Sequence, residues 1–202
     1  MIAILIPLFL LAVIMHEVAH GWVAYRLGDP TAKYAGRLTL NPIPHIDPIG
    51  TIFFPAILIL SGSPVVFGWA KPVPINFALL RNPKKGILWV SAAGISANLL
   101  LALAFSLFLR IGIFPFNSYG WYFLNYGILI NLVLAVFNAV PIPPLDGSRI
   151  AMSLLPPDLA ASYMQLERYG FLIILALLWL GILGRIIWPI VGILAYILGA
   201  SL

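Results

Sequence analysis

The chain has 202 residues, of which 62% are hydrophobic and 8% are charged, and its formal net charge is +5. With a mean hydropathy of +1.07 these proportions exclude an ordinary soluble domain and predict an integral membrane protein. The basic residues are scattered between apolar runs, which argues against a nucleic-acid partner, and the absence of cysteine excludes thiolate metal sites.

Apolar runs follow one another at residues 1–27, 49–69, 86–109, 121–140 and 171–202. A helix of roughly 20 residues crosses a membrane, and the first, third and fourth runs reach that length without interruption. The last run is broken near Gly181, which predicts two short helices or one long helix with a bent tail. We therefore predict an all-α polytopic membrane protein with about five transmembrane helices, in a single membrane-embedded domain over residues 1–202.

The second run differs in composition from the others. Gly50, Pro55 and the sequence SGSP at 61–64 interrupt it, and its aromatic and β-branched residues favour extended backbone. We therefore predict a re-entrant or β-like segment at about residues 50–68, lying against the protein instead of crossing the membrane.

The basic residues indicate the orientation of the chain. If the second run does not cross, only Arg110 and Arg185 lie on one side of the membrane. The opposite side then holds Arg26, Lys33, Arg37, Lys71, Arg81, Lys84, Lys85, Arg149 and Arg168. Because lysine and arginine accumulate in cytoplasmic loops, we expect this second side to be cytoplasmic.

The first run contains the sequence HEVAH at residues 16–20. His16 and His20 are four residues apart, so on a helix they share one face and both imidazoles can bind a single cation. Glu17 lies beside them, where a general base for a water molecule activated by the metal is needed. Burying such groups in a bilayer is costly unless they are paired or coordinated, which favours a metal site over a cluster that only ties helices together by hydrogen bonds.

Two imidazoles need a third partner, because catalytic zinc usually takes three protein ligands and leaves the fourth position for water. The candidates near the predicted cytoplasmic side are Asp29, His45, Asp47, Asp146, Asp158 and Glu167. Asp146 follows the proline-rich stretch VPIPPL, which forbids a regular helix and can hold the carboxylate at a fixed depth. Spacing alone leaves both Asp146 and its main rival His45 open.

HEVAH in an apolar run and NAVPIPPLDG at 138–147 resemble the motifs of the site-2 proteases, the intramembrane zinc metalloproteases of peptidase family M50. The resemblance spans the chain from the first run to Asp146. It implies that His16, His20 and Asp146 bind one zinc ion and that Glu17 activates water.

Two further segments match this family. AAGISAN at 92–98 resembles its middle motif, although Ile95 stands where the family usually has proline. The match implies that Asn98 positions the substrate or stabilises the developing oxyanion; the alternative is an interhelical hydrogen bond. GWAKPVPIN at 68–76 resembles a segment of the compact, short-chain members, which carry no PDZ or CBS domain.

The resemblance implies an intramembrane protease that cleaves single-span membrane proteins within or near their transmembrane segments. We expect a multi-pass protein of the cell membrane, surrounded by lipid, with its active site towards the cytoplasmic side. A strand edge at 50–68 would capture the unwound substrate by β-addition. The alternatives are an ion or metal transporter, disfavoured because the run at 86–109 carries no ionisable residue, and an inactive homologue that binds membrane partners.

Overall fold

The computed structural model describes residues 2–62 and 68–201, over which the chain forms helices and loops and no β-strand. The predicted all-α class is therefore confirmed for these residues. The elements are α1 (Ile2–Arg26), α2 (Thr31–Tyr34), η1 (Ile43–His45), η2 (Pro48–Phe53), α3 (Phe54–Leu60), η3 (Phe77–Leu79), α4 (Pro83–Ile111), α5 (Tyr119–Ala139), α6 (Asp146–Leu154), α7 (Pro157–Met164), α8 (Glu167–Trp179) and α9 (Ile182–Leu198).

Three of the helices in the described part of the chain are long and apolar enough to cross a membrane: α1, α4 and α5. They correspond to the first, third and fourth predicted runs. A fourth crossing is reached only if α8 and α9 form one span, and these two helices are bent by 76° at their junction. Gly181 makes the bend, because its φ of +70° lies in the left-handed region that favours glycine. The predicted number of about five transmembrane helices is not confirmed.

Of the predicted re-entrant or β-like segment at about 50–68, the β-like form is wrong for the residues described up to position 60, which are helical; residues 63–67 lie outside the described part, and the re-entrant form stays a prediction. Local capping explains the difference. The side chain of Asp47 accepts hydrogen bonds from the backbone N–H groups of Ile49 and Gly50, and prolines occupy the first turns of η2 and α3. These signals outweigh the β propensity of the run, so no described strand edge is present for β-addition.

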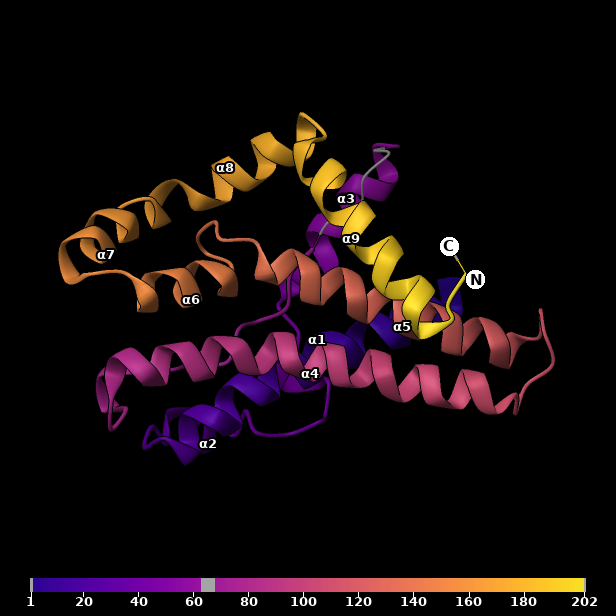
Figure 1. Ribbon diagram of the computed structural model, residues 1–202, viewed down its shortest axis with the longest axis horizontal. Helices are drawn as coiled ribbons and strands as arrows, with labels where there is room; N and C mark the ends of the chain where they lie inside the picture. The colour runs from indigo at the N-terminus through magenta and orange to yellow at the C-terminus, as the bar shows by residue number, and fades with distance from the viewer. Residues whose placement is uncertain (1, 63–67, 202) are drawn as a thin grey trace.

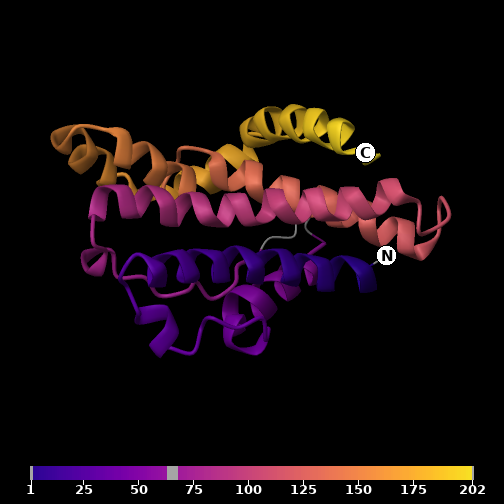
Figure 2. The same ribbon diagram turned by 60° about the horizontal axis from the view of Figure 1, so that its bottom comes forward.

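The long helices α1, α4 and α5 all pack against one another; in Figure 1, α1 crosses behind α4 and α9 crosses over α5. Figure 2 shows a layered arrangement: the connection that contains α2 and α3 covers the outer side of α1, while α9 covers the opposite side of the molecule. The main core lies between α4, α5 and α9, where Ala102, Ile128, Leu132 and Val191 are buried.

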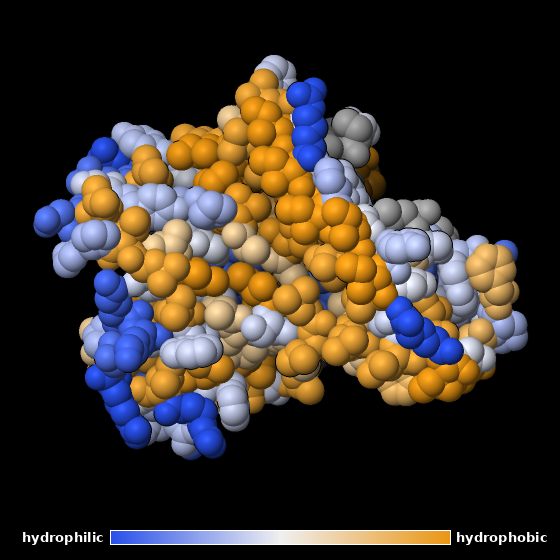
Figure 3. Space-filling view, in the orientation of Figure 1, coloured by the Kyte–Doolittle hydropathy of each residue, from blue (hydrophilic) through white to orange (hydrophobic). Residues whose placement is uncertain are grey.

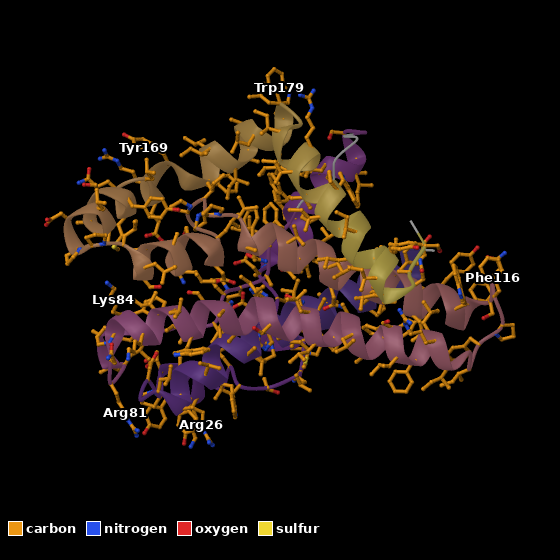
Figure 4. All side chains as sticks on the ribbon, viewed as in Figure 1. Arg26, Arg81, Lys84, Phe116, Tyr169 and Trp179 are labelled. Carbon is orange, nitrogen blue, oxygen red and sulfur yellow. The ribbon has the colours of Figure 1, made fainter. Side chains whose placement is uncertain are left out.

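The surface divides into an apolar body and a polar end. Figure 3 shows a broad hydrophobic surface over the middle of the molecule, as expected for helices that face lipid, with hydrophilic residues concentrated at one end. In Figure 4, Arg26, Arg81 and Lys84 lie at that end and Phe116 lies at the opposite end. Basic residues from the end of α1 and the start of α4 are thus brought together.

Candidate metal centre

The structure brings His16, His20 and Asp146 together. Helix α1 places the two imidazoles one turn apart, with their Nε2 atoms separated by 2.9 Å. The Oδ2 atom of Asp146, the first residue of α6, lies 3.0 Å from Nε2 of His16 and 3.1 Å from Nε2 of His20. All three side chains are buried. Within the described residues, this is the group of histidine and carboxylate ligands able to hold one metal ion.

The loop before α6 aims Asp146 at the histidines. Gly147 must be a glycine, because a Cβ atom there would overlap the carbonyl of Ala139 at the end of α5. Gly170 of α8 packs equally closely against the carbonyl of Pro143, and the hydroxyl of Tyr163 donates to Pro141 O at 2.6 Å. The proline-rich turn is therefore held from two sides, which fixes the depth at which the carboxylate enters.

Helix α4 forms the wall of the site behind the two histidines. A Cβ atom at Gly94 would overlap the Nε2 atoms of both His16 and His20. Because Gly94 has no side chain, there is room for the ligand atoms to meet. The AAGISAN motif alone did not predict this role.

The partners of the two Nδ1 atoms assign the tautomers. His20 Nδ1 lies 2.7 Å from the carbonyl oxygen of Val90, which can only accept, so this nitrogen carries a proton. His16 Nδ1 lies 2.7 Å from Asn98 Oδ1, and Asn98 Nδ2 donates to Ala12 O at 3.1 Å and to Asn131 Oδ1 at 2.9 Å. The Nδ1 proton on each imidazole leaves Nε2 free as a ligand.

Three acceptor atoms therefore face one another in a buried place. Asp146 Oδ2 receives no hydrogen bond that would offset its burial, so a cation between the three atoms, either a proton or a metal ion, is needed. A metal ion takes the place of the shared proton when it binds.

This donor set fits zinc. Two imidazole nitrogens and one carboxylate oxygen are the ligands of many catalytic zinc sites, and they leave one position open. Tetrahedral ligands at about 2.0 Å from zinc lie about 3.3 Å apart, a little more than the 2.9–3.1 Å between these three atoms. Only a small outward movement of the side chains is required.

Glu17 follows His16 on α1 and is half-buried. Its Oε2 atom accepts a hydrogen bond of 2.8 Å from the backbone N–H of Val73. The carboxylate, next to His16 in the chain, is thus held by a segment that the sequence did not connect with it.

The other predicted ligand candidates lie elsewhere. His45, the main rival of Asp146, is buried in η1 with Nε2 bonded to the carbonyl of Thr39. Asp29 accepts from the backbone N–H groups of Thr31 and Asn76. The remaining three are Asp47, which caps η2, Asp158, in the first turn of α7, and Glu167, 3.9 Å from Arg149.

An apolar cavity of about 340 Å³ adjoins α6 on the side of the basic end. Phe77 of η3, Ile87 of α4 and Met152 of α6 are among its lining residues, and Arg149 lies over the ring of Phe77. Its walls therefore include the helix that begins with Asp146.

Comparisons with known proteins agree with this arrangement. Residues 115–180 match Peptidase family M50. "Putative zinc metalloprotease YwhC" of Bacillus subtilis (strain 168) is 40% identical over 185 residues, which cover 88% of this chain and 81% of that protein. The chain belongs to peptidase family M50. M50 membership identifies it as an intramembrane zinc metalloprotease, as the motifs predicted.

More distant relatives match most of the chain. "Putative zinc metalloprotease Rip2" of Mycolicibacterium smegmatis is 28% identical over 200 residues, 96% of this chain and 76% of that protein. The protein of the same name from Mycobacterium tuberculosis H37Rv is 26% identical over 169 residues, 84% of this chain and 64% of that protein. No solved structure matches the chain.

Proposed function

We propose that this M50 peptidase hydrolyses peptide bonds within or near the transmembrane segments of single-span membrane proteins. His16, His20 and Asp146 are the zinc ligands. Glu17 is the general base. The observation that carries the proposal is that two Nε2 atoms and one carboxylate oxygen, all buried, lie within 3.1 Å of one another.

Zinc at such a site lowers the pKa of a water molecule from about 15.7 towards 7 and polarises a peptide carbonyl. Glu17 accepts the proton that the attacking water loses and returns it to the leaving amine. The Nδ1 bonds to Val90 O and Asn98 Oδ1 keep both imidazoles oriented during this cycle.

The substrate has to unwind before it is cut, because the carbonyl of a helical peptide bond is already hydrogen-bonded within the helix. Hydrolysis also consumes water, which requires a polar path from one side of the membrane. The basic end of the molecule, with Arg26, Arg81 and Lys84, supports a path from the cytoplasm. The apolar cavity beside α6 offers room for a substrate side chain on this route.

Asn98 is fully engaged by other protein groups, since its Oδ1 atom is bonded to His16 and both amide hydrogens are donated. These contacts support a role in holding His16. Stabilising an oxyanion would require one of the amide hydrogens to leave its present acceptor.

We propose that residues 1–202 form a single domain. Helices α4, α5, α8 and α9 contribute to one hydrophobic core, and α1 packs on α4 and α5, so residues 1–202 are expected to fold as one membrane-embedded unit.

A cleavage assay with a panel of single-span proteins in liposomes tests the function. The native chain is compared with Glu17→Gln, which keeps the shape of the side chain and removes the base. We expect this variant to bind zinc as the native chain does and to lose roughly 10²- to 10⁴-fold in cleavage rate. Equal rates for the two proteins would refute the mechanism, and solute flux without a peptide product would favour a transporter.

A further inference from the structure

We propose that the extended segment 69–76 is a backbone clamp that positions Glu17, and that Asp29 and Arg37 act on catalysis by holding this clamp. The inference rests on the proposed role of Glu17 as general base. It gives a function to the GWAKPVPIN sequence and to two buried charged residues that the zinc site does not use.

The clamp touches Glu17 through one backbone group. The N–H of Val73 donates to Glu17 Oε2 at 2.8 Å. Pro72 and Pro74 flank Val73 and have no N–H, so within residues 72–74 this is the one backbone donor. Proline also restricts its own φ and biases the preceding residue towards extended backbone, which limits the directions in which the Val73 N–H can point.

The segment lies directly on α1. A Cβ atom at Gly21, one turn after Glu17, would come within 2.9 Å of Val73 Cγ1 and 2.7 Å of Leu38 Cδ2. The side chain of Val73 is buried at 6% exposure. Gly21 therefore permits the close approach that brings the Val73 N–H to the carboxylate.

Two buried charged side chains hold the segment on either side of Val73. Arg37 donates through Nη2 to Lys71 O at 2.5 Å and to Pro72 O at 3.4 Å. Asp29 accepts through Oδ2 from the N–H of Asn76 at 2.7 Å. The exposed fraction of Arg37 is 6% and that of Asp29 is 0%. Burying a charge is costly unless it is hydrogen-bonded, and these bonds to the clamp offset that cost.

The start of the segment is anchored to η1 and η2 through its own backbone groups, and the hydroxyl of Thr51 donates to Trp69 O at 2.8 Å. The N–H of Lys71 donates to His45 O at 2.9 Å, and the N–H of Trp69 donates to Gly50 O at 3.0 Å. His45, which the sequence offered as a zinc ligand, thus contributes its carbonyl to the clamp.

The clamp is useful to the reaction because a general base must lie within hydrogen-bond reach of the water that it deprotonates. A hydrogen bond to one carboxylate oxygen restricts the rotation of the Glu17 side chain, and a misplacement of 1 Å can cost about 10²-fold in rate. If the segment had only a structural role, changing it would lower the turnover rate only together with folding or zinc binding.

The sharpest test removes one hydrogen-bond donor and keeps the side chain. Replacing Val73 by its α-hydroxy acid converts the amide N–H into an ester oxygen. We expect kcat to fall about 10- to 100-fold, with KM and zinc content unchanged. The matched control is the same replacement at Trp121, whose N–H donates to Ser118 Oγ at 3.2 Å at the start of α5, outside the clamp; its kcat should stay within about twofold of native.

A double-mutant cycle shows whether the donor acts through Glu17. In the Glu17→Gln background the ester at residue 73 should cause no further loss of residual cleavage, since the base is already absent. Independent, multiplicative losses would overturn the proposal. So would an increase in kcat for the single ester variant, because the bond would then restrain Glu17 in a resting position.

Arg37→Lys tests the hydrogen bonds by which Arg37 holds the clamp. Lysine keeps the charge but not the planar guanidinium that reaches two carbonyl groups, so kcat should fall while zinc content and KM are retained. Arg81→Lys, at an exposed position, is the control and should leave kcat unchanged. Loss of zinc in parallel with activity in Arg37→Lys and the Val73 ester would assign the segment a purely structural role. If Glu17→Gln cleaves like the native chain, the proposed function fails first, independently of these variants.

Discussion

The Nδ1–H group of His16 donates to Asn98 Oδ1 at 2.7 Å, and this bond determines which nitrogen of His16 faces the candidate metal centre. Asn98 also donates to Asn131 and to the backbone of Ala12. One asparagine therefore joins α1, α4 and α5 at the depth of the zinc ligands, so the orientation of His16 depends on how three helices pack.

Asn98→Ala should weaken zinc binding. Without its acceptor, His16 loses both a fixed ring orientation and the preference for a proton on Nδ1, and losses of this kind typically cost 10- to 100-fold in metal affinity. Competition with a chelator measures the change. Asn125→Ala, which removes a buried asparagine bonded to Ser201, is the control and should keep native zinc affinity. Native affinity in Asn98→Ala, together with lost cleavage, would instead support an oxyanion role.

Asp146→Ala should lose most of its zinc. We expect the purified native chain to carry about one zinc ion, and two imidazoles alone bind it weakly. Metal analysis after dialysis gives the stoichiometry. His45→Ala should retain the metal, because the side chain of His45 is bonded to Thr39 O and lies outside the three-ligand group. The opposite pattern would transfer the ligand role to His45.

Gly94→Ala should abolish zinc binding although it adds only one methyl group. The new Cβ atom would overlap both Nε2 atoms, so α4 or the imidazoles must shift. Gly184→Ala is the matched helical control, since the closest atom to its Cβ would be 3.7 Å away. Zinc content and cleavage should be native in that variant, and native zinc content in Gly94→Ala would contradict the described packing.

The orientation can be measured with cysteine labelling, since the chain contains no cysteine of its own. Lys84→Cys and Phe116→Cys place single thiols at exposed positions on opposite ends of the molecule. A membrane-impermeant maleimide should label position 116 in intact cells and position 84 only after the cytoplasmic face is opened. The reverse pattern would place the basic end outside the cell.

Local patterns in the sequence were enough to predict the features that depend on short stretches of the chain, such as the length and periodicity of helices. The apolar runs predict α1, α4 and α5, because the length of a spanning helix follows from the thickness of the bilayer. The four-residue spacing in HEVAH predicts that His16 and His20 share a face, because helical periodicity is a property of the backbone. The motif resemblance added the family and the choice of Asp146.

Tertiary structure decided what depends on contacts between distant segments. Spacing left Asp146 and His45 open, and only the packing of α6 against α4 and α5 brings the Asp146 carboxylate to within 3.1 Å of both imidazoles. The run at 48–60 is helical because caps outweigh its β propensity. The bond from Val73 to Glu17 has no sequence signal, because a backbone donor is present at almost every residue and only the fold selects one of them.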